Sequence, residues 1–333
     1  MTVLRALPGA ARPSGWQHPL HDPARAWPET NCYVDLWIEV LHALGLDPLA
    51  AMGFTLATDF EGDQWTFFKP PLGDLWELYR VEVEELTIWR PVLDHLGEQL
   101  GRGRLVLVEV DAFHLPDTAA TDYRQRHTKT TIAAESLDRE GKRLGYFHNA
   151  VYHELSGEDF AALFERGAID QGAETPGLPP YAELVKVGRI AQRSPAELRT
   201  IARRLLARAL DRRPDDNPLQ AFRARFPAFA EWLAARDLSA FHAYAFATLR
   251  QLGACFELAA AHLRWLAPDA FAPAAARFEE ISTGVKTMLF KVARMVAGAK
   301  KKQSFDETLA SMEAAWAAGM DAVLAVARPA REA

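Results

Sequence analysis

Three side chains in the first half of the chain have types suited to thiol chemistry: Cys32, His127 and Asn149. A thiol reacts as the thiolate, and the partial positive charge at a helix N-terminus stabilises that form. A neighbouring imidazole can form an ion pair with the thiolate and later protonate a leaving group, while a third polar group orients the imidazole. We interpret the three residues as nucleophile, general base and acid, and orienting group of an acyl-transfer site.

The nucleophile in this interpretation requires a helix that begins near Cys32. Gly45 supplies a natural stop for that helix, and Cys32 would lie in its first turn. Apolar residues follow at helical spacing: Val34, Trp37, Ile38, Leu41 and Leu44.

His127 and Asn149 flank a stretch that reads as a β-hairpin. Two strand-like runs within 128–149 are joined by a polar loop at 138–142 that contains Gly141. If the hairpin folds about Glu140, its two outer ends return to the same end of the sheet, and His127 and Asn149 become neighbours. An amide is a sufficient orienting group here, because a thiolate–imidazolium pair is already ionised.

Two other histidines compete for the role of base. His148 lies next to Asn149 on a strand, so its side chain is expected to point to the opposite face. His114 lies at the exit of the preceding strand. We therefore favour His127, although each residue also has an ordinary structural explanation: a single cysteine that opens an amphipathic helix is most often a small buried residue.

An aromatic segment supplies candidate substrate contacts. Trp65 and Phe67 could form the wall of an acyl pocket, and Asp63 and Gln64 precede them. Gln64, or the backbone amide of Cys32, could donate to a tetrahedral oxyanion. Aromatic residues at such spacing are more often core residues, so both explanations stay open.

The two halves of the chain show different patterns. In the first part of the chain, helices are predicted near Leu75 and over 86–100, and strands at 105–113 and 184–187. From Ser194 a capping box opens a helix to about Leu210, and further helices are predicted over 217–235, 238–266, 272–298 and 304–327. We expect an α+β domain over 1–190 and an α-helical domain over 191–333.

Composition limits the function. The chain has 333 residues, 49% of them hydrophobic, and a formal net charge of -6, which argues against nucleic acid as a partner. It has neither a signal-peptide pattern nor an apolar stretch of transmembrane length, so we expect a cytoplasmic protein that does not enter membranes. Two cysteines do not make a disulfide framework, and motifs for zinc, nucleotides or nicotinamide are missing, so no metal is expected.

The segment from Asn31-Cys32 to Asn149 resembles the N-terminal domain of the butirosin biosynthesis protein H type. The shared features are the cysteine that opens a helix, the stretch VEVDAFHLPDT with Asp111 and Pro116, His127 before the hairpin, and YFHN at its end. As a whole the chain looks more like a bacterial family of unknown function than like the antibiotic enzyme.

This resemblance implies a papain-like fold and a specific reaction. An acyl or aminoacyl group would pass from the phosphopantetheine thioester of a carrier protein, through Cys32, to a small amine acceptor, with no cofactor bound to the protein itself. His127 would be the base and Asn149 the orienting residue, although related enzymes commonly have Asp at that position. Asp111, His114 and His148 are expected to lie at the substrate site.

Two other functions remain open. The same three residues would serve a cysteine peptidase or amidase. Alternatively, the chain is a binding protein that kept the fold and lost the chemistry.

Overall fold

The structure is a computed structural model that describes residues 3–7, 16–165, 180–298 and 304–327. The chain forms two compact units, which we call the sheet unit and the helical unit. The sheet unit comprises Met1–Asp22, Asn31–Pro48 and Leu75–Gln192, and the helical unit comprises Pro23–Thr30, Leu49–Asp74 and Arg193–Ala333. The chain passes from the sheet unit to the helical unit for the last time after Gln192, near the predicted boundary at residue 190. Two segments from the first part of the chain, Pro23–Thr30 and Leu49–Asp74, also belong to the helical unit.

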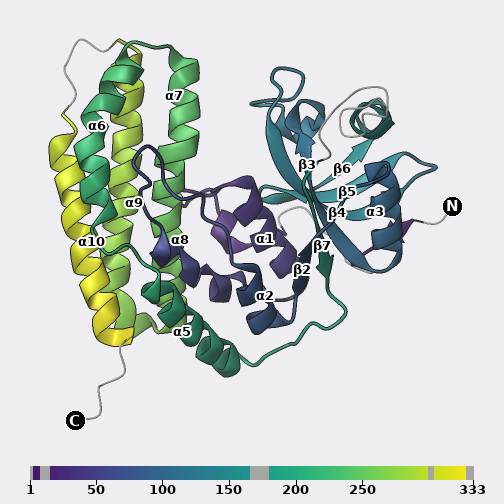
Figure 1. Cartoon of the computed structure of the whole chain (residues 1–333), viewed down its shortest axis with the longest axis horizontal. Coiled ribbons are helices and arrows are strands. Elements are labelled where there is room, and N and C mark those ends of the chain that lie inside the picture. Colours follow the sequence, from purple (N-terminus) through teal and green to yellow (C-terminus); the bar gives the residue numbers. More distant parts are fainter. Residues whose placement is uncertain (1–2, 8–15, 166–179, 299–303, 328–333) are drawn as a thin grey trace. The chain divides into compact units, whose positions relative to one another are not determined.

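The sheet unit contains an antiparallel sheet of seven strands, which confirms the α+β class (Figure 1). Six strands follow one another in the order β2-β7-β3-β4-β5-β6, and β1 pairs with β4 outside this path. The strands are β1 (Leu4–Arg5), β2 (Glu82–Glu85), β3 (Arg104–Asp111), β4 (Lys129–Asp138), β5 (Arg143–His148), β6 (Val151–Ser156) and β7 (Ala182–Lys186).

The register of the strands defines the two faces of the sheet. Leu107 of β3 pairs with Glu183 of β7 and with Ala133 of β4. Paired residues point to the same face, and alternate residues point to opposite faces. Tyr33, the second residue of α1 (Cys32–Ala43), donates a hydrogen bond of 2.6 Å to Glu183. Helix α1 therefore covers the face to which Leu107 points, which we call the α1 face.

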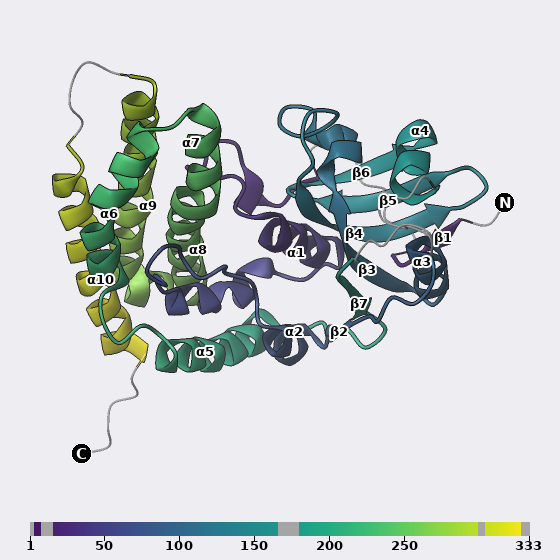
Figure 2. The same cartoon turned by 45° about the horizontal axis from the view of Figure 1, so that its top comes forward.

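Shorter helices complete the sheet unit. Figure 2 shows α1 and α3 on opposite sides of the sheet. The predicted helix over 86–100 begins only after Pro91, because a proline disfavours helical geometry in the residue before it. The short elements are α2 (Leu72–Tyr79), which crosses the unit boundary, α3 (Val92–Gly101), α4 (Gly157–Phe160), and the 3-10 turns Pro19–His21, Ala112–His114 and Pro116–Thr118.

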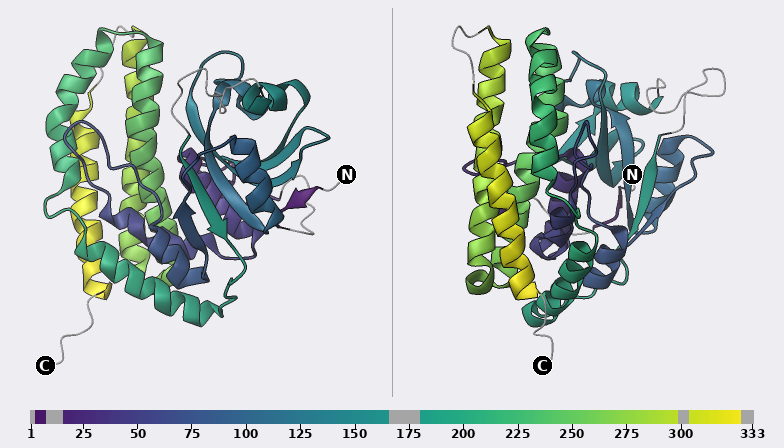
Figure 3. Two further views of the ribbon diagram at one scale, coloured as in Figure 1. Left: turned by 45° about the vertical axis from the view of Figure 1, so that its right-hand side comes forward. Right: turned by 60° about the vertical axis from the view of Figure 1, so that its left-hand side comes forward.

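The helical unit confirms the long helices expected from the sequence (Figure 3). Ser194 and Glu197 form the predicted capping box at the start of α5. Helix α9 packs against α8 and α10, and α10 also packs against α6. The helices are α5 (Pro195–Asp211), α6 (Pro218–Ala234), α7 (Leu238–Tyr244), α8 (Gln251–Leu266), α9 (Pro268–Val296) and α10 (Asp306–Ala327), with a π-helical turn at Ala245–Arg250.

Among the described helices, α10 alone has the length and apolar composition that would allow it to cross a membrane. Its buried residues, such as Leu309, Met312 and Val323, belong to the core of the helical unit. A buried core helix meets the same criteria.

Candidate active site

Cys32 is the first residue of α1, as the apolar pattern predicts. The side chain of Asn31 caps the helix by accepting a hydrogen bond of 2.9 Å from the amide of Val34. Behind this cap, Val34 and Trp37 are fully buried and fix the helix against the sheet unit. Cys32 is a free, half-buried cysteine at the end of the helix where unpaired amides gather.

His127 lies just before β4 and is oriented by Asp111, the last residue of β3. The distance from its Nδ1 to Oδ2 of Asp111 is 2.5 Å, and its ring stacks on Phe113 with ring centroids 4.3 Å apart. Its side chain is 72% exposed. If Nδ1 donates its hydrogen to the carboxylate, Nε2 keeps a lone pair that faces away from Asp111 and can accept a proton.

The carboxylate of Asp111 is held in place on several sides. Its Oδ1 accepts hydrogen bonds from the amides of Phe113, at 3.0 Å, and Thr128, at 3.2 Å. Partial burial raises the pKa of Asp111, but hydrogen bonds from His127 and these amides outweigh burial and lower the pKa below its usual value. The carboxylate therefore stays ionised at neutral pH and can stabilise an imidazolium at His127.

Cys32 and the His127–Asp111 pair lie on the same face of the sheet. Asp111 follows Leu107 by four residues along β3, so its side chain points to the α1 face. The N-terminal turn of α1 reaches the same face through the bond from Tyr33 to Glu183. Within the described part of the chain, the thiol of Cys32 has no hydrogen-bond partner, so its contact with His127 remains a prediction.

The structure gives Asn149 a different position from the one predicted. Asn149 opens the two-residue loop between β5 and β6 and has φ 48°, a left-handed conformation that Asn tolerates better than most residues. Because Ala133 pairs with Phe147, Asn149 lies opposite Thr131, four residues beyond His127 and roughly 13 Å along an extended strand. The orienting partner of His127 is therefore Asp111 and not Asn149.

His148 points away from the α1 face, as the alternation along β5 predicts. Its Nδ1 is hydrogen-bonded to Asp117, and its Nε2 lies 2.7 Å from the hydroxyl of Thr130. Tyr146 also donates to Asp117. Burial raises the pKa of Asp117, but the bond from His148 more than compensates and lowers it. This buried network fixes Asp117, in the loop after β3, to the sheet, and the substrate contact expected for His148 stays a prediction.

His114 stays near the pair formed by His127 and Asp111. It ends the 3-10 turn Ala112–His114 and its ring packs on Phe113. Burial lowers the pKa of His114, the charge of Asp111 raises it, and the charge of His127 lowers it. The structure therefore places His114 beside His127 and Asp111, and its contact with substrate stays a prediction.

The four predicted substrate contacts near Trp65 belong to the helical unit. Trp65 is 3% exposed and packs on Phe60 and Phe222, with ring centroids 5.2 and 5.4 Å apart, so it is a core residue rather than the wall of an open pocket. Asp63 and Gln64 are exposed in the turn between Phe60 and Trp65, which form an isolated bridge. Phe67 is also exposed. No interaction within the described residues joins these four to Cys32.

A buried histidine with two carboxylates was not predicted. His21 contacts Oε1 of Glu39 at 2.5 Å and Oδ1 of Asp35 at 3.4 Å, and all three side chains are buried. Burial lowers the pKa of His21, but the hydrogen bonds to Asp35 and Glu39 outweigh burial and raise it to about 9. His21 lies in an arm without periodicity, so no sequence pattern links it to α1.

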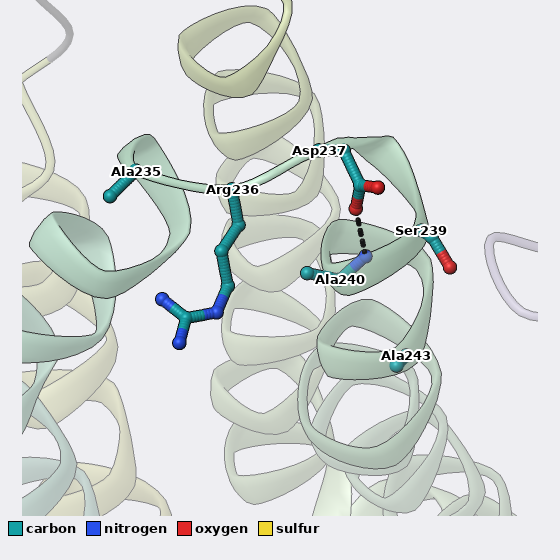
Figure 4. Close-up of a pocket in the computed structure, with 6 residues that line it drawn as sticks. All are labelled: Ala235, Arg236, Asp237, Ser239, Ala240 and Ala243. Carbon is teal, nitrogen blue, oxygen red and sulfur yellow. Dashed lines mark hydrogen bonds between the residues drawn. The ribbon is translucent and has the colours of Figure 1, made fainter.

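A surface cavity of the helical unit lacks comparable chemistry. It lies at the turn between α6 and α7 and is lined mainly by small side chains (Figure 4). Asp237 there caps α7 by accepting from the amide of Ala240. Within the described residues, no group of three or more His, Cys, Asp or Glu side chains, His21 with Asp35 and Glu39 included, has an arrangement that could hold a metal ion.

Comparisons with known proteins identify the family of the chain. Residues 16–187 match the DUF1839 N-terminal domain, and residues 195–325 match the DUF1839 C-terminal domain. A search of curated proteins found no match. The resemblance to the butirosin biosynthesis protein H type gains no support from these comparisons. Because the N-terminal match alone covers more than half of the chain, the protein belongs to the DUF1839 family.

Proposed function

We propose that the protein is a cysteine-nucleophile acyltransferase, with Cys32 as nucleophile, His127 as general base and acid, and Asp111 as the residue that orients His127. One observation carries the proposal: a half-buried thiol at a helix N-terminus and an imidazole–carboxylate pair lie on the same face of one sheet. Catalytic hydrogen bonds often close only when substrate is bound, so the lack of a thiol–imidazole bond in the free protein is compatible with this assignment.

The proposed reaction has two balanced steps. His127 takes the proton of Cys32, the thiolate attacks the carbonyl of a thioester, and the departing thiol receives that proton while an S-acyl bond forms on Cys32. An amine then attacks the acyl group, His127 accepts the proton of the amine, and the thiol of Cys32 is restored. The unpaired amides of the first turn of α1, including that of Cys32 itself, are the proposed donors to the oxyanion.

The donor and acceptor rest on the resemblance described above. We propose a carrier-protein phosphopantetheine thioester as donor and a small amine as acceptor. A hydrolase with the same residues would pass through the same S-acyl enzyme and release it to water. The fate of the acyl group therefore separates the two reactions.

Intact-protein mass spectrometry with an aminoacylated carrier protein tests the proposal. We expect one aminoacyl adduct on the wild type, none on Cys32→Ser, and an adduct on Cys255→Ser. Cys255 is the matched control because it is fully buried and burial raises its pKa to about 12. An added amine such as glycine methyl ester should discharge the adduct as an amide. A wild type that never acquires an adduct would contradict the proposal, and an adduct lost equally fast without amine would favour a hydrolase.

A further inference from the structure

A second surface cavity, of about 560 Å³, lies in the sheet unit where β7 ends and β2 and β3 begin. Glu82 at the start of β2, Lys186 at the end of β7 and Arg104 at the start of β3 lie side by side in register. The turns that flank these strands add Arg80, Arg102 and Arg189. Three segments that are distant in the sequence thus converge on one cavity.

This cavity is separate from the candidate active site. Arg104 precedes Leu107 by three residues along β3, so its side chain points to the face opposite α1. Lys186 pairs with Arg104 and shares that face. None of the residues proposed for acyl transfer lines the cavity.

The lining of the cavity is strongly basic, although the whole chain is acidic. It contains four arginines and one lysine, and Glu82 is the single acid among the described residues that line it. Two neighbouring carboxylates also reach these cations: Glu98 pairs with Arg102, and Glu84 pairs with Lys186. Five cations against three carboxylates leave a net charge of +2 in a chain whose formal net charge is -6.

Within the described residues, three of the five cations form no ion pair: Arg80, Arg104 and Arg189, of which Arg104 donates a hydrogen bond to the side chain of Gln99. The guanidinium of Arg80 stacks over the ring of Trp76, 4.7 Å from its centroid, which leaves its N–H edges available for hydrogen bonds. Within the described residues the guanidinium groups of Arg80 and Arg189 have neither a hydrogen bond nor an ion pair, while the backbone amide of Arg80 donates to the carbonyl of Trp76. Arg80 also has φ 59°, a conformation that costs free energy in a non-glycine residue.

We propose that this cavity binds the phosphate chain of a soluble ligand that carries two or more linked phosphates. Planar guanidinium groups bind phosphate oxygens through paired N–H donors, and the two arginines without partners are available for such bonds. Several cations around one cavity favour a multiply charged anion over the singly charged phosphodiester of phosphopantetheine. The proposal does not depend on the function proposed for Cys32.

Isothermal titration of the full-length protein with pyrophosphate at low ionic strength tests this inference. We expect saturable binding that weakens as sodium chloride is added, because screening reduces charge–charge attraction. The double variant Arg80→Gly, Arg189→Gln should bind about tenfold more weakly or worse, the change expected when charged hydrogen bonds are lost. Glycine adopts positive φ without penalty and neither arginine holds an ion pair, so the fold should be retained.

Two controls make the result decisive. Arg143→Gln, which removes an exposed arginine from the start of β5, should bind pyrophosphate like the wild type. Arg189→Gln alone serves if the double variant melts early. The inference is overturned if the wild type gives no heat with pyrophosphate, if Arg189→Gln and the double variant both bind like the wild type, or if polyglutamate binds more tightly than pyrophosphate. The last result would identify an acidic protein segment as the ligand.

Discussion

The carboxylate of Asp111 gives the imidazole of His127 both a fixed orientation and a stabilised positive charge. An ionised carboxylate favours the imidazolium that the proposed reaction forms twice, once when Cys32 loses its proton and once when the amine attacks. The backbone of Asn149 adopts the left-handed conformation that the tight turn between β5 and β6 requires.

These assignments predict that one substitution slows acyl transfer and another does not. Asp111→Asn should lower the rate of acyl transfer by roughly tenfold to a hundredfold, because a neutral amide stabilises the imidazolium less and does not fix the tautomer of the neutral imidazole. Asn149→Gly should leave the rate nearly unchanged, since glycine fits φ 48°. Single-turnover kinetics on both variants provide the measurement. A large loss in Asn149→Gly with little loss in Asp111→Asn would restore the assignment made from the sequence.

The buried hydrogen bonds that join His148, Thr130 and Asp117 lead to a second prediction about single residues. Thr130→Val keeps the shape of the side chain but leaves Nε2 of His148 without its partner, which should lower the free energy of unfolding by about 1–3 kcal/mol. Because His148 faces away from α1, the alkylation rate of Cys32 should not change. Urea unfolding and iodoacetamide labelling test the two parts. A slower alkylation in a folded Thr130→Val protein would connect His148 to the thiol.

At the scale of elements, α1 is held on two sides. Its apolar residues face the sheet unit, and its carboxylates at positions 35 and 39 bind His21 of the N-terminal arm. The ring of Trp16 also packs on His42, with centroids 4.5 Å apart. The arm and α1 therefore form one structural element whose stability depends on a buried imidazolium.

The raised pKa of His21 predicts a definite pH dependence of stability. Below the unfolded pKa of 6.5 both states carry the proton and the stabilisation is complete; it is lost as the pH rises through about 9, where folded His21 loses its proton. Between these values the difference of about 2.5 in pKa corresponds to about 3 kcal/mol. Guanidinium unfolding of wild type and His21→Gln at several pH values should show a fall in the wild type that the variant lacks. Parallel pH profiles would contradict the assignment.

At the scale of the whole molecule, the sequence predicts correctly those helices and strands that depend on residues close together in the chain. The apolar period after Cys32, the capping box at Ser194 and the β-branched run of β3 correctly indicate a helix, a helix start and a strand. The predicted helix over 86–100 is too long at its start, because Pro91 disfavours helical geometry in the residue before it. Strand β2 has the acidic sequence EVEE, which lacks a strong strand signal.

The sequence does not predict which distant segments of the chain pack together. Segment 49–74 belongs to the helical unit, where His262 contacts the carbonyl oxygen of Leu49 and Cys255 contacts Thr58. These partners are about two hundred residues apart, and the spacing of apolar residues does not reveal such contacts. The partner of His127 likewise depends on tertiary structure. The hairpin register that places Asn149 opposite Thr131 depends on strand pairing, whereas Asp111 approaches from a different strand.

The alkylation rate of Cys32 at neutral pH tests the central claim most directly. The chain has two cysteines and Cys255 is buried, so native labelling with iodoacetamide reports on Cys32 alone. We predict that Cys32 is labelled faster than an unperturbed thiol, because a helix N-terminus and a nearby imidazole favour the reactive thiolate. In His127→Ala labelling at neutral pH should slow. Labelling at the rate of an unperturbed thiol, unchanged in His127→Ala, would contradict the account.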